Sequence, residues 1–475
     1  MRAALTILSA LLVAPAALAQ EAPPSPEAKR IAELEQRLRE LERRMGEQPL
    51  APAQPGPPAP EPAPPTPEPN APTPAPSQPT GANPAGPAQP KDDEIKLELK
   101  LETLNGYRVE ASPGKGFTIV APEDRFAATV RARLQLRDTY LMQGDKDTNE
   151  LNVRTVRLIT HGHILSKSWR YLIQLAFGSN DYEGTNHSPI FDAFLESTHH
   201  RDLNVRVGQF FVPFDRQRTT REFALNLVDR PLVVRELTLD RDVGVMLSSS
   251  DLFGAGVLGY HIFVGGGEGR NRFGGAEPGP LVVGRLTAHP FGAFDEDSEG
   301  DLERKEELRV ALGVAGGYNY RTSRAQSTFG NTLTAGVVDY VHAAADLVLK
   351  YGGFSLQLEG VYRHGEENSV EQVVNGVATR QFSRSGHGYF VQAGMMATDE
   401  LELVGRWEQL VAEDRRTDPA LRTLARQTGR QVGGGVNYYL NGHAFKVQLD
   451  YFYLFGHNDE SAKDHQVRLQ LDVSF

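Results

Sequence analysis

The sequence has no cysteine among its 475 residues and only two tryptophans. The lack of cysteine excludes disulfide bonds and thiol chemistry, and it fits an oxidising compartment in which a stray thiol would be a liability. Beyond the N-terminal apolar run, no stretch reaches the roughly 18 uninterrupted apolar residues that a membrane-spanning helix needs. The remaining chain is therefore expected either to be soluble or to cross lipid as strands.

Basic charge is in deficit over the whole chain. Lys and Arg number 50 against 61 Asp and Glu, which gives a net charge of −11. The acidity is spread along the chain, because residues 1–90 hold only seven of the basic and nine of the acidic side chains. Such a chain does not bind DNA or phosphate by bulk charge, so we expect no nucleic-acid partner.

The first residues have the pattern of an export signal. Arg2 precedes an apolar run from 3 to 14, and Ala-Leu-Ala at 17–19 has the small-x-small form of a cleavage site. We therefore expect residues 1–19 to be a signal peptide and the mature chain to lie outside the cytoplasm. A first transmembrane helix is the alternative, but the run is short for the ~20 residues that such a helix needs.

A heptad pattern follows, in the segment that we assign to residues 20–48. Its apolar residues are spaced three and four apart, as in a coiled coil: Ile31, Leu34, Leu38, Leu41 and Met45. Two heptads are marginal alone in water, so the pattern predicts self-association of a periplasmic coiled coil. A lone amphipathic helix packed elsewhere is the alternative.

Proline is concentrated in the next segment, residues 49–92. From 49 to 90, 18 of the 42 residues are proline. This composition cannot bury a core, and it predicts an extended linker that reaches at most roughly 130 Å at about 3.1 Å per residue. Residues 93–124 then hold two or three short alternating pieces, and we expect them to form an N-terminal periplasmic segment.

From 125 to 475, apolar and polar side chains alternate with a period of two. The closing sequence QVRLQLDVSF shows the pattern over its whole length. Sixteen such segments can be counted, and most are near the ~9–11 residues of a tilted membrane-spanning strand. The expected strands are 125–141, 151–166, 169–178, 190–199, 203–212, 243–250, 255–264, 281–289, 308–320, 338–350, 353–363, 387–397, 400–411, 431–440, 443–455 and 466–475.

The connectors between these segments alternate between short and long, as in barrels of the outer membrane. A soluble sandwich also alternates, but its apolar side points into one packed core. We therefore predict an all-β fold, a 16-stranded antiparallel transmembrane β-barrel over 125–475, preceded by the coiled coil and the linker. An even strand count puts both ends of the barrel on the short-turn side, which is expected to be periplasmic.

Two features depart from this pattern. The connector at 290–307 is long although it falls on the short-turn side. In the second strand, Arg157, Ile159 and His161 break the alternation, which predicts a β-bulge.

If apolar residues face lipid, the opposite face of each strand lines a wet lumen. The arginines on this face are Arg131, Arg133, Arg137, Arg170, Arg206 and Arg468. A row of guanidinium groups stays charged and offers donors to phosphate and carboxylate, so it favours anions. The alternative is a lumen of balanced charge, because acidic residues share the face: Asp192, Glu196, Glu359, Glu408, Asp450 and Asp472.

The longest early connector, residues 213–242, is rich in both charges. In sixteen-stranded porins the loop at this place folds inward and narrows the channel. Its arginines are therefore expected to line a constriction: Arg216, Arg218, Arg221, Arg230 and Arg235. We expect a helical turn at Phe223–Val228. An ordinary surface loop with paired charges is the alternative.

Several segments resemble the phosphate-selective porin O and P family. They are RTVRLITHGHI, GQFFVPF at 208–214, RDVGV at 241–245, YYLNGHAFKVQLDYFYL and DHQVRLQLDVSF. The resemblance spans 107–475 and implies a homotrimer of sixteen-stranded barrels, with an arginine ladder and with lysines near the constriction. The arginines have plausible equivalents here, whereas only Lys446 is clearly a lumen-facing strand lysine. The terminal Phe475 also resembles the signal by which outer-membrane barrels are recognised for insertion.

The predicted function is passive diffusion of small anions, phosphate or other oxyanions, across the bacterial outer membrane. Homotrimer neighbours and outer-membrane lipid are the expected partners. A general or cation-tolerant porin whose N-terminal region also tethers the membrane to the cell wall is the alternative, with peptidoglycan as a partner.

Enzymatic activity is not expected, and neither a cofactor nor a metal is indicated. The pair His161 and His163 lacks a third ligand, and Ser385 near His387 lacks an orienting partner. The glycine-rich stretch at 265–275 joins two strands without a following helix, so it does not read as a nucleotide loop.

Overall fold

The computed structural model describes most of the chain from Leu99 to Phe475. It does not describe 105, 145, 179–180, 183–187, 273–278, 375–376, 414–428 and 456–462. By its internal contacts the chain divides into two units, Met1–Lys91 and Asp92–Phe475, and every described residue belongs to the second. The predicted signal peptide, coiled coil and linker lie outside the described residues, so those assignments stay predictions.

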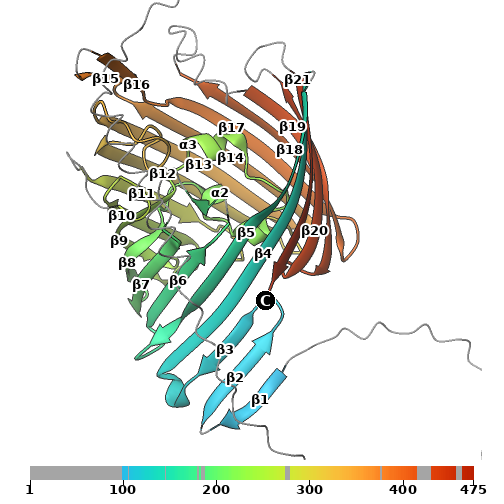
Figure 1. Ribbon diagram of the computed structural model, residues 1–475. Coiled ribbons are helices and arrows are strands. Elements are labelled where there is room, and N and C mark those ends of the chain that lie inside the picture. Colours follow the sequence, from blue (N-terminus) through green and yellow to red (C-terminus); the bar gives the residue numbers. More distant parts are fainter. Residues whose placement is uncertain are drawn as a thin grey trace, which may run out of the picture. The chain divides into compact units, whose positions relative to one another are not determined.

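Sixteen strands form a closed antiparallel barrel in the described part of the chain (Figure 1). The first eight are β4 (Phe126–Gln143), β5 (Lys146–Ile164), β6 (Trp169–Ala176), β7 (Ile190–His200), β8 (Leu203–Phe211), β9 (Arg241–Ser249), β10 (Leu258–Gly265) and β11 (Leu281–Ala288). The others are β12 (Arg309–Thr322), β13 (Val338–Tyr351), β14 (Phe354–Gly365), β17 (Gly386–Met396), β18 (Leu401–Ala412), β19 (Gly429–Asn441), β20 (Phe445–Phe455) and β21 (Lys463–Ser474). Each pairs with the next in order, and β21 pairs with β4 to close the cylinder.

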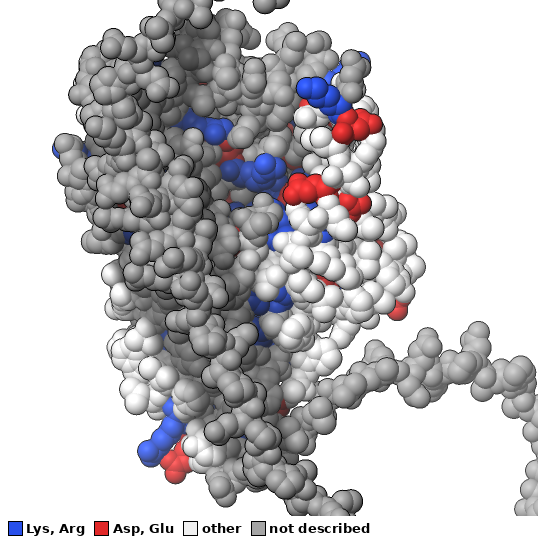
Figure 2. Space-filling model, viewed as in Figure 1, with Lys and Arg blue, Asp and Glu red and all other residues white. Residues whose placement is uncertain are grey.

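The two faces of the strands show which side meets lipid. Outward-pointing Leu286 and Val314 are 60% and 55% exposed, whereas inward-pointing Arg363 and Lys446 are fully buried. A soluble sandwich has the opposite distribution, with apolar side chains inside, so the barrel prediction is confirmed over the sandwich. Figure 2 shows the same property, because the described right flank is mostly white and carries few charged side chains.

The barrel has one end with short turns and one with long loops. We call the end that carries Phe126 and Ser474 the short-turn end, and the opposite one the long-loop end. β5 starts at Lys146, earlier than predicted, so the first connector at the long-loop end is only residues 144–145. The loop after β14 carries the hairpin β15 (Ser369–Val374) and β16 (Val377–Phe382). At the short-turn end, η4 (Leu252–Gly254) lies between β9 and β10.

The predicted bulge is present in β5. Gln135 pairs with Thr155 and Leu136 pairs with Val153, so Arg154 is the extra residue. From Thr155 onward the odd residues of β5 therefore change face, which turns Arg157 into the barrel.

Residues 99–124 add a small antiparallel sheet at the short-turn end. It consists of β1 (Leu99–Leu104), β2 (Tyr107–Ser112) and β3 (Gly116–Val120), followed by η1 (Pro122–Asp124). β3 pairs with β4 along the same edge that β21 uses, beyond the end of β21. Figure 1 shows these three strands extending β4 past the C-terminus.

The connector between β8 and β9, residues 212–240, folds into the barrel, and we call it the inner loop. It contains α2 (Arg216–Thr219), η3 (Glu222–Ala224) and α3 (Leu232–Leu237). Its apolar residues are fully or nearly fully buried against strand side chains that face inward: Phe214, Val233, Val234, Leu237 and Leu239. Inward folding was predicted correctly.

The predicted helical turn at Phe223–Val228 was misplaced. The short turn η3 ends at Ala224, and the longest helical segment starts only after Pro231, which stands at the N-cap of α3. Asp215 caps α2 by accepting a hydrogen bond from the backbone N–H of Arg218 at 2.8 Å. Asp215 and Pro231 at the N-caps thus determine where α2 and α3 begin.

The long connector at the short-turn end, residues 289–308, also folds inward, and we call it the inner turn. The Arg221 N–H donates to the Asp297 carbonyl at 3.2 Å, and the Glu299 N–H donates to the Ala224 carbonyl at 3.0 Å. The two inward segments thus meet inside the barrel. None of the helices in the described part of the chain is long and apolar enough to cross a membrane.

Candidate solute pathway through the barrel

The inner loop divides the lumen into unequal parts. A cavity of about 740 Å³ lies between it and strands β4–β11, and we call it the arginine cavity. A second cavity of about 250 Å³ lies between the loop and strands β4 and β18–β21. Both cavities are lined by Asp229, Arg230 and Arg235, so these residues lie where the two meet. Along β14, β17 and β18 the loop is sealed against the wall by α3.

The arginine cavity is lined by twelve arginines, seven carboxylate side chains and no lysine. The arginines are Arg133, Arg154, Arg157, Arg170, Arg206, Arg216, Arg218, Arg221, Arg230, Arg235, Arg241 and Arg285. The carboxylates are those of Asp181, Asp192, Glu196, Glu222, Asp229, Glu296 and Asp297. The lining therefore carries five more positive than negative groups, which favours anions in the water between them.

The three arginines predicted on the first strand do not form a row of free groups. Arg133 binds Asp472 through Nε at 3.1 Å and Nη2 at 2.6 Å. Arg137 binds Asp229 of the inner loop at 2.9 Å. Arg131 is half-buried and its guanidinium carbon lies 5.5 Å from the centre of the Phe223 ring.

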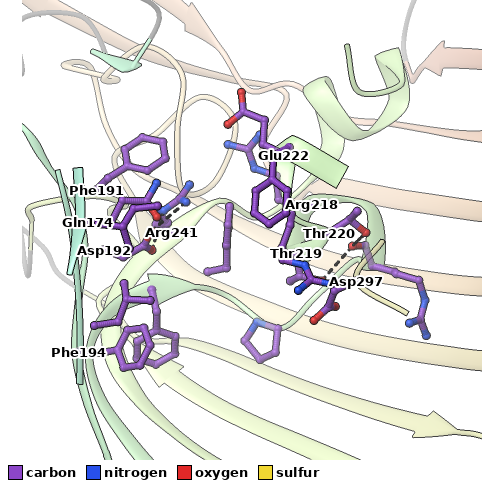
Figure 3. A pocket seen from close by; sticks show the side chains of 18 of the residues that line it. Gln174, Phe191, Asp192, Phe194, Arg218, Thr219, Thr220, Glu222, Arg241 and Asp297 are labelled. Atoms are coloured by element: carbon purple, nitrogen blue, oxygen red, sulfur yellow. Dashed lines mark hydrogen bonds and ion pairs between the residues drawn. The ribbon is translucent and has the colours of Figure 1, made fainter. Parts of the chain in front are cut away.

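Arginines on other walls stack on phenyl rings while they bind carboxylates. Arg206 binds Glu196 at 2.8 Å, with its guanidinium carbon 4.3 Å from the Phe194 ring centre. Arg241 binds Asp192 at 2.8 Å and lies 3.7 Å from the Phe191 ring centre. Figure 3 shows Phe191, Asp192 and Arg241 together on one side of the pocket. Such stacks fix the guanidinium plane and strengthen the site by about 0.5–2 kcal/mol each.

The five predicted loop arginines all line the arginine cavity. Arg216 binds Asp346 at 2.6 Å and also contacts Glu296 of the inner turn. Arg218 binds Asp240 at 2.7 Å.

The other three differ in exposure and in partners. Arg221 is half exposed and pairs with Asp295. Arg230 donates to the carbonyls of Gln217 and Thr220. Arg235 is exposed and has no ion pair with a described residue.

Arginines of the barrel wall and of the inner loop lower the pKa values of two acids in the loop. Burial alone would raise the pKa of Glu222, but Arg157 and Arg133 hold that pKa well below its usual range. Burial likewise opposes ionisation of Asp240, and Arg218 and Arg241 outweigh it to lower the pKa. Both carboxylates therefore stay ionised at any physiological pH and cancel part of the arginine charge.

Two lysines of the barrel wall bind the inward-folded segments and do not line the arginine cavity. Lys446 faces the lumen as expected, but it is fully buried and donates to the Leu225 carbonyl of the inner loop at 2.6 Å. Lys350 donates to the carbonyls of Asp295 and Ser298 in the inner turn, at 2.9 and 2.6 Å. The two lysines thus hold the inward segments in place.

Sequence reasoning missed several lining arginines. Arg157 was read as a break in the pattern, and Arg154, Arg241 and Arg285 were not predicted to line the lumen. The signal was available in part, because a one-residue bulge at the break would have turned Arg157 inward. Among the described residues no group of three or more His, Asp or Glu side chains is placed to hold a metal.

A family model described as phosphate-selective porin O and P matches residues 126–475. The chain belongs to the phosphate-selective porin O and P family. It is therefore an outer-membrane porin, and the strands cross the lipid of that membrane.

Individual relatives of this porin are distant. An uncharacterized protein of Aquifex aeolicus (strain VF5) is 22% identical over 427 residues, which cover 81% of this chain and 95% of that protein. The solved anion-selective porin from Comamonas acidovorans is 11% identical with a TM-score of 0.47, over 73% of this porin and 99% of that chain. The outer membrane channel DcaP of Acinetobacter baumannii is 12% identical with a TM-score of 0.46, over 74% of this porin and 98% of that chain.

Proposed function

We propose that this porin lets small anions, phosphate and other oxyanions among them, diffuse passively across the outer membrane. The observation that carries the proposal is the charge of the arginine cavity, where twelve arginines stand against seven carboxylates. Guanidinium groups remain charged at all relevant pH values and match the oxygens of phosphate and carboxylate. A solute in the cavity is surrounded by donors that suit an anion.

The pairing of the arginines limits how strongly anions are preferred. Nine of the twelve have a carboxylate oxygen within 4.0 Å. Paired groups attract a solute less than free ones, because their fields largely cancel at a distance. This observation favours the second candidate function, a general porin that also admits cations.

Reversal potentials in planar bilayers distinguish the two functions. In a gradient of potassium chloride, the reversal potential of the purified porin is expected to have the sign of a chloride-selective channel. Added phosphate is expected to reduce the chloride current. A cation preference of the purified porin in this gradient would contradict the proposal. A weak preference without phosphate competition would favour the general porin.

The N-terminal region has proposed roles of its own. The family implies a trimer, and we infer that the short-turn end, with residues 93–124, faces the periplasm. The heptads within 20–48 and the proline-rich 49–92 would extend from it toward the cell wall, once a signal peptide of residues 1–19 is removed. Peptidoglycan is the partner that this arrangement suggests.

Truncation of residues 20–90 separates tethering from assembly. We expect the truncated barrel to remain a trimer with unchanged conductance, and the cell envelope to be altered. Loss of trimers in detergent, measured by light scattering, would instead assign the segment to assembly. Unchanged trimers with an unaltered envelope would remove the tether.

A further inference from the structure

Asp229 of the inner loop is surrounded by arginines from three strands. It lies between η3 and α3, and its side chain is 20% exposed. Its two carboxylate oxygens lie 2.9 Å from Arg137 of β4 and 2.7 Å from Arg468 of β21. Arg154 of β5 is 3.8 Å away. These strands include the seam where the barrel closes.

The charges around Asp229 do not balance. Arg468 has a second carboxylate, because Asp450 accepts two hydrogen bonds from it at 2.8 and 2.7 Å. Arg137 directs its other hydrogen bonds to Gln470 and to the Val228 carbonyl, which are uncharged. In the described part of the chain, Arg154 and Arg137 have no other carboxylate within 4.0 Å, so they share the single charge of Asp229.

Arg235 adds a third underneutralised group. It is exposed, and its charge helps to hold down the pKa of Asp229. Other ion pairs in the lumen are shielded from water. Arg406 and Glu408, for example, both belong to β18, and their side chains are 1% and 0% exposed. The Asp229 cluster is therefore open and short of negative charge.

The cluster also lies on the solute path. Asp229 and Arg235 line both cavities, so a solute that moves between them contacts these side chains. Asp229 stands on a loop instead of a strand, which leaves its side chain able to turn away from the arginines by a change of rotamer.

We propose that Asp229 is an internal counter-ion that competes with permeating oxyanions for the cavity-lining Arg154 and Arg235, while Arg137 binds Asp229 from the wall. The inference rests on the proposed function and names the residue that sets its specificity. A phosphate oxygen pair has the spacing and charge to replace the Asp229 carboxylate on the same guanidinium donors. The competition weakens oxyanion binding enough for the solute to leave, which a passive channel requires.

The competition is present at every physiological pH. Burial works to raise the pKa of Asp229, but Arg137, Arg468 and Arg154 hold that pKa well below its usual range. The counter-ion is therefore always charged, and only a substitution removes it.

The test measures block of chloride current by inorganic phosphate in planar bilayers containing the full-length porin. Asp229→Asn is expected to lower the half-blocking phosphate concentration about tenfold or more, as for the loss of one charged competitor. Asp229→Glu, which keeps the charge, is expected to stay near the wild type. Asp202→Asn, in the short turn after β7, makes the same charge change outside the lumen and is expected to stay within twofold, by the same estimate.

An Asp229→Asn channel whose half-blocking concentration stays within about twofold of wild type, against the tenfold expected, overturns the proposal. So does an equal shift in Asp229→Glu, because the effect would then come from loop displacement. Should Asp229→Asn form no channels, Arg235→Gln decides, since this exposed side chain has no described ion pair to break. A higher half-blocking concentration in Arg235→Gln supports the proposal, and an unchanged one overturns it.

The selectivity of the wild-type channel tests the proposed function independently of the role of Asp229. If wild-type channels show no anion preference in a salt gradient, the function fails whatever the variants do. If wild-type channels prefer anions and Asp229→Asn leaves the phosphate block unchanged, only the role of Asp229 fails.

Discussion

The two sides of the inner loop differ in chemistry and in what they do. On one side, Val233, Val234 and Leu237 of α3 are almost completely buried against β14, β17 and β18. On the other, arginines of the same loop face water and the wall of β5–β11. The loop is thus an amphipathic partition, with its apolar side against β14, β17 and β18 and its arginines toward the larger cavity.

Glycines of the barrel wall make room for the partition. A Cβ on Gly388 would lie 2.8 Å from Val233 Cγ2 and 2.4 Å from the Gln409 carbonyl oxygen. A Cβ on Gly435 would lie 3.0 Å from Leu227 Cδ2. Close approach of loop and strand therefore requires glycine at these places.

The strongest way to break the partition is a charge on its sealed side. Val233→Asp buries an unpaired carboxylate, which costs several kcal/mol and should detach α3 from the wall. We expect single-channel conductance to rise severalfold. Val233→Ala is the control, because it leaves a small cavity and should keep conductance near the wild type. Wild-type conductance in Val233→Asp would show that the seal does not depend on this contact.

Paired arginines are expected to matter for stability. Arg133→Gln leaves the Asp472 carboxylate, whose side chain is 0% exposed, without its charged partner. Breaking such a buried pair costs about 3–5 kcal/mol. Arg125→Gln is the matched control, since Arg125 and Glu123 are more than 70% exposed and their pair is worth about 0–1 kcal/mol. Equal unfolding free energies of the two variants in urea would contradict the comparison.

Arginines with weak or no pairing are expected to matter for selectivity. The triple variant Arg154→Gln, Arg170→Gln and Arg235→Gln removes three of the five excess positive charges of the arginine cavity. The reversal potential should shift toward cations, while the free energy of unfolding changes by about 1 kcal/mol or less because exposed charges contribute little. A variant that loses stability and keeps its selectivity would reverse the assigned roles.

The stability of the folded porin is expected to depend weakly on pH through Asp215 of the inner loop. Burial raises the pKa of Asp215 to about 6, although Thr238 and Arg218 oppose the shift. The folded state therefore holds a proton that the unfolded state loses above about pH 4, and stability falls as pH rises to about 6.

Asp215 Oδ2 is buried without a hydrogen-bond partner in the described chain, so the carboxylate form is poorly stabilised there. The neighbouring Arg216 is bound to Asp346, which also binds Arg285, so these groups keep their own partners. Melting temperatures in detergent from pH 4 to 8 should fall by a few degrees. In Asp215→Asn this slope should disappear, and a slope equal to the wild type would exclude Asp215 as its source.

The barrel could be predicted from local pattern because lipid on one face and water on the other impose a period of two on every strand. The sixteen strands, the bulge in β5 and the inward direction of 212–240 were all confirmed. The short alternating pieces noted within 93–124 correspond to β1–β3, but the pairing of β3 with the edge of β4 could not be predicted, since it depends on where β21 stops. The N-terminal predictions lie outside the described residues.

The residue type that lines the larger cavity was predictable, but the partners of these arginines were not. Arg133 and Asp472 lie 339 residues apart, and their contact follows from barrel closure. The long connector at 290–307 was noticed as an exception, but its inward course depends on Lys350 and on Asn226, whose backbone N–H is bound by Glu299. The fold was therefore needed to tell which arginines are free and which are paired with a carboxylate.

The small sheet at the short-turn end has a consequence for how the cylinder is joined. β21 pairs with β4 from Gln143 to Arg133, and Phe475 exchanges backbone hydrogen bonds with Ala132. The pairing of β3 with β4 begins next to it, at Val130. A two-residue slide of the final strand would keep its lipid and water faces correct, so side-chain pattern alone cannot forbid it. β3 already pairs with the backbone of β4 from Val130 to Ala127, where a shifted β21 would have to pair. β3 therefore fixes the register of β21 against β4.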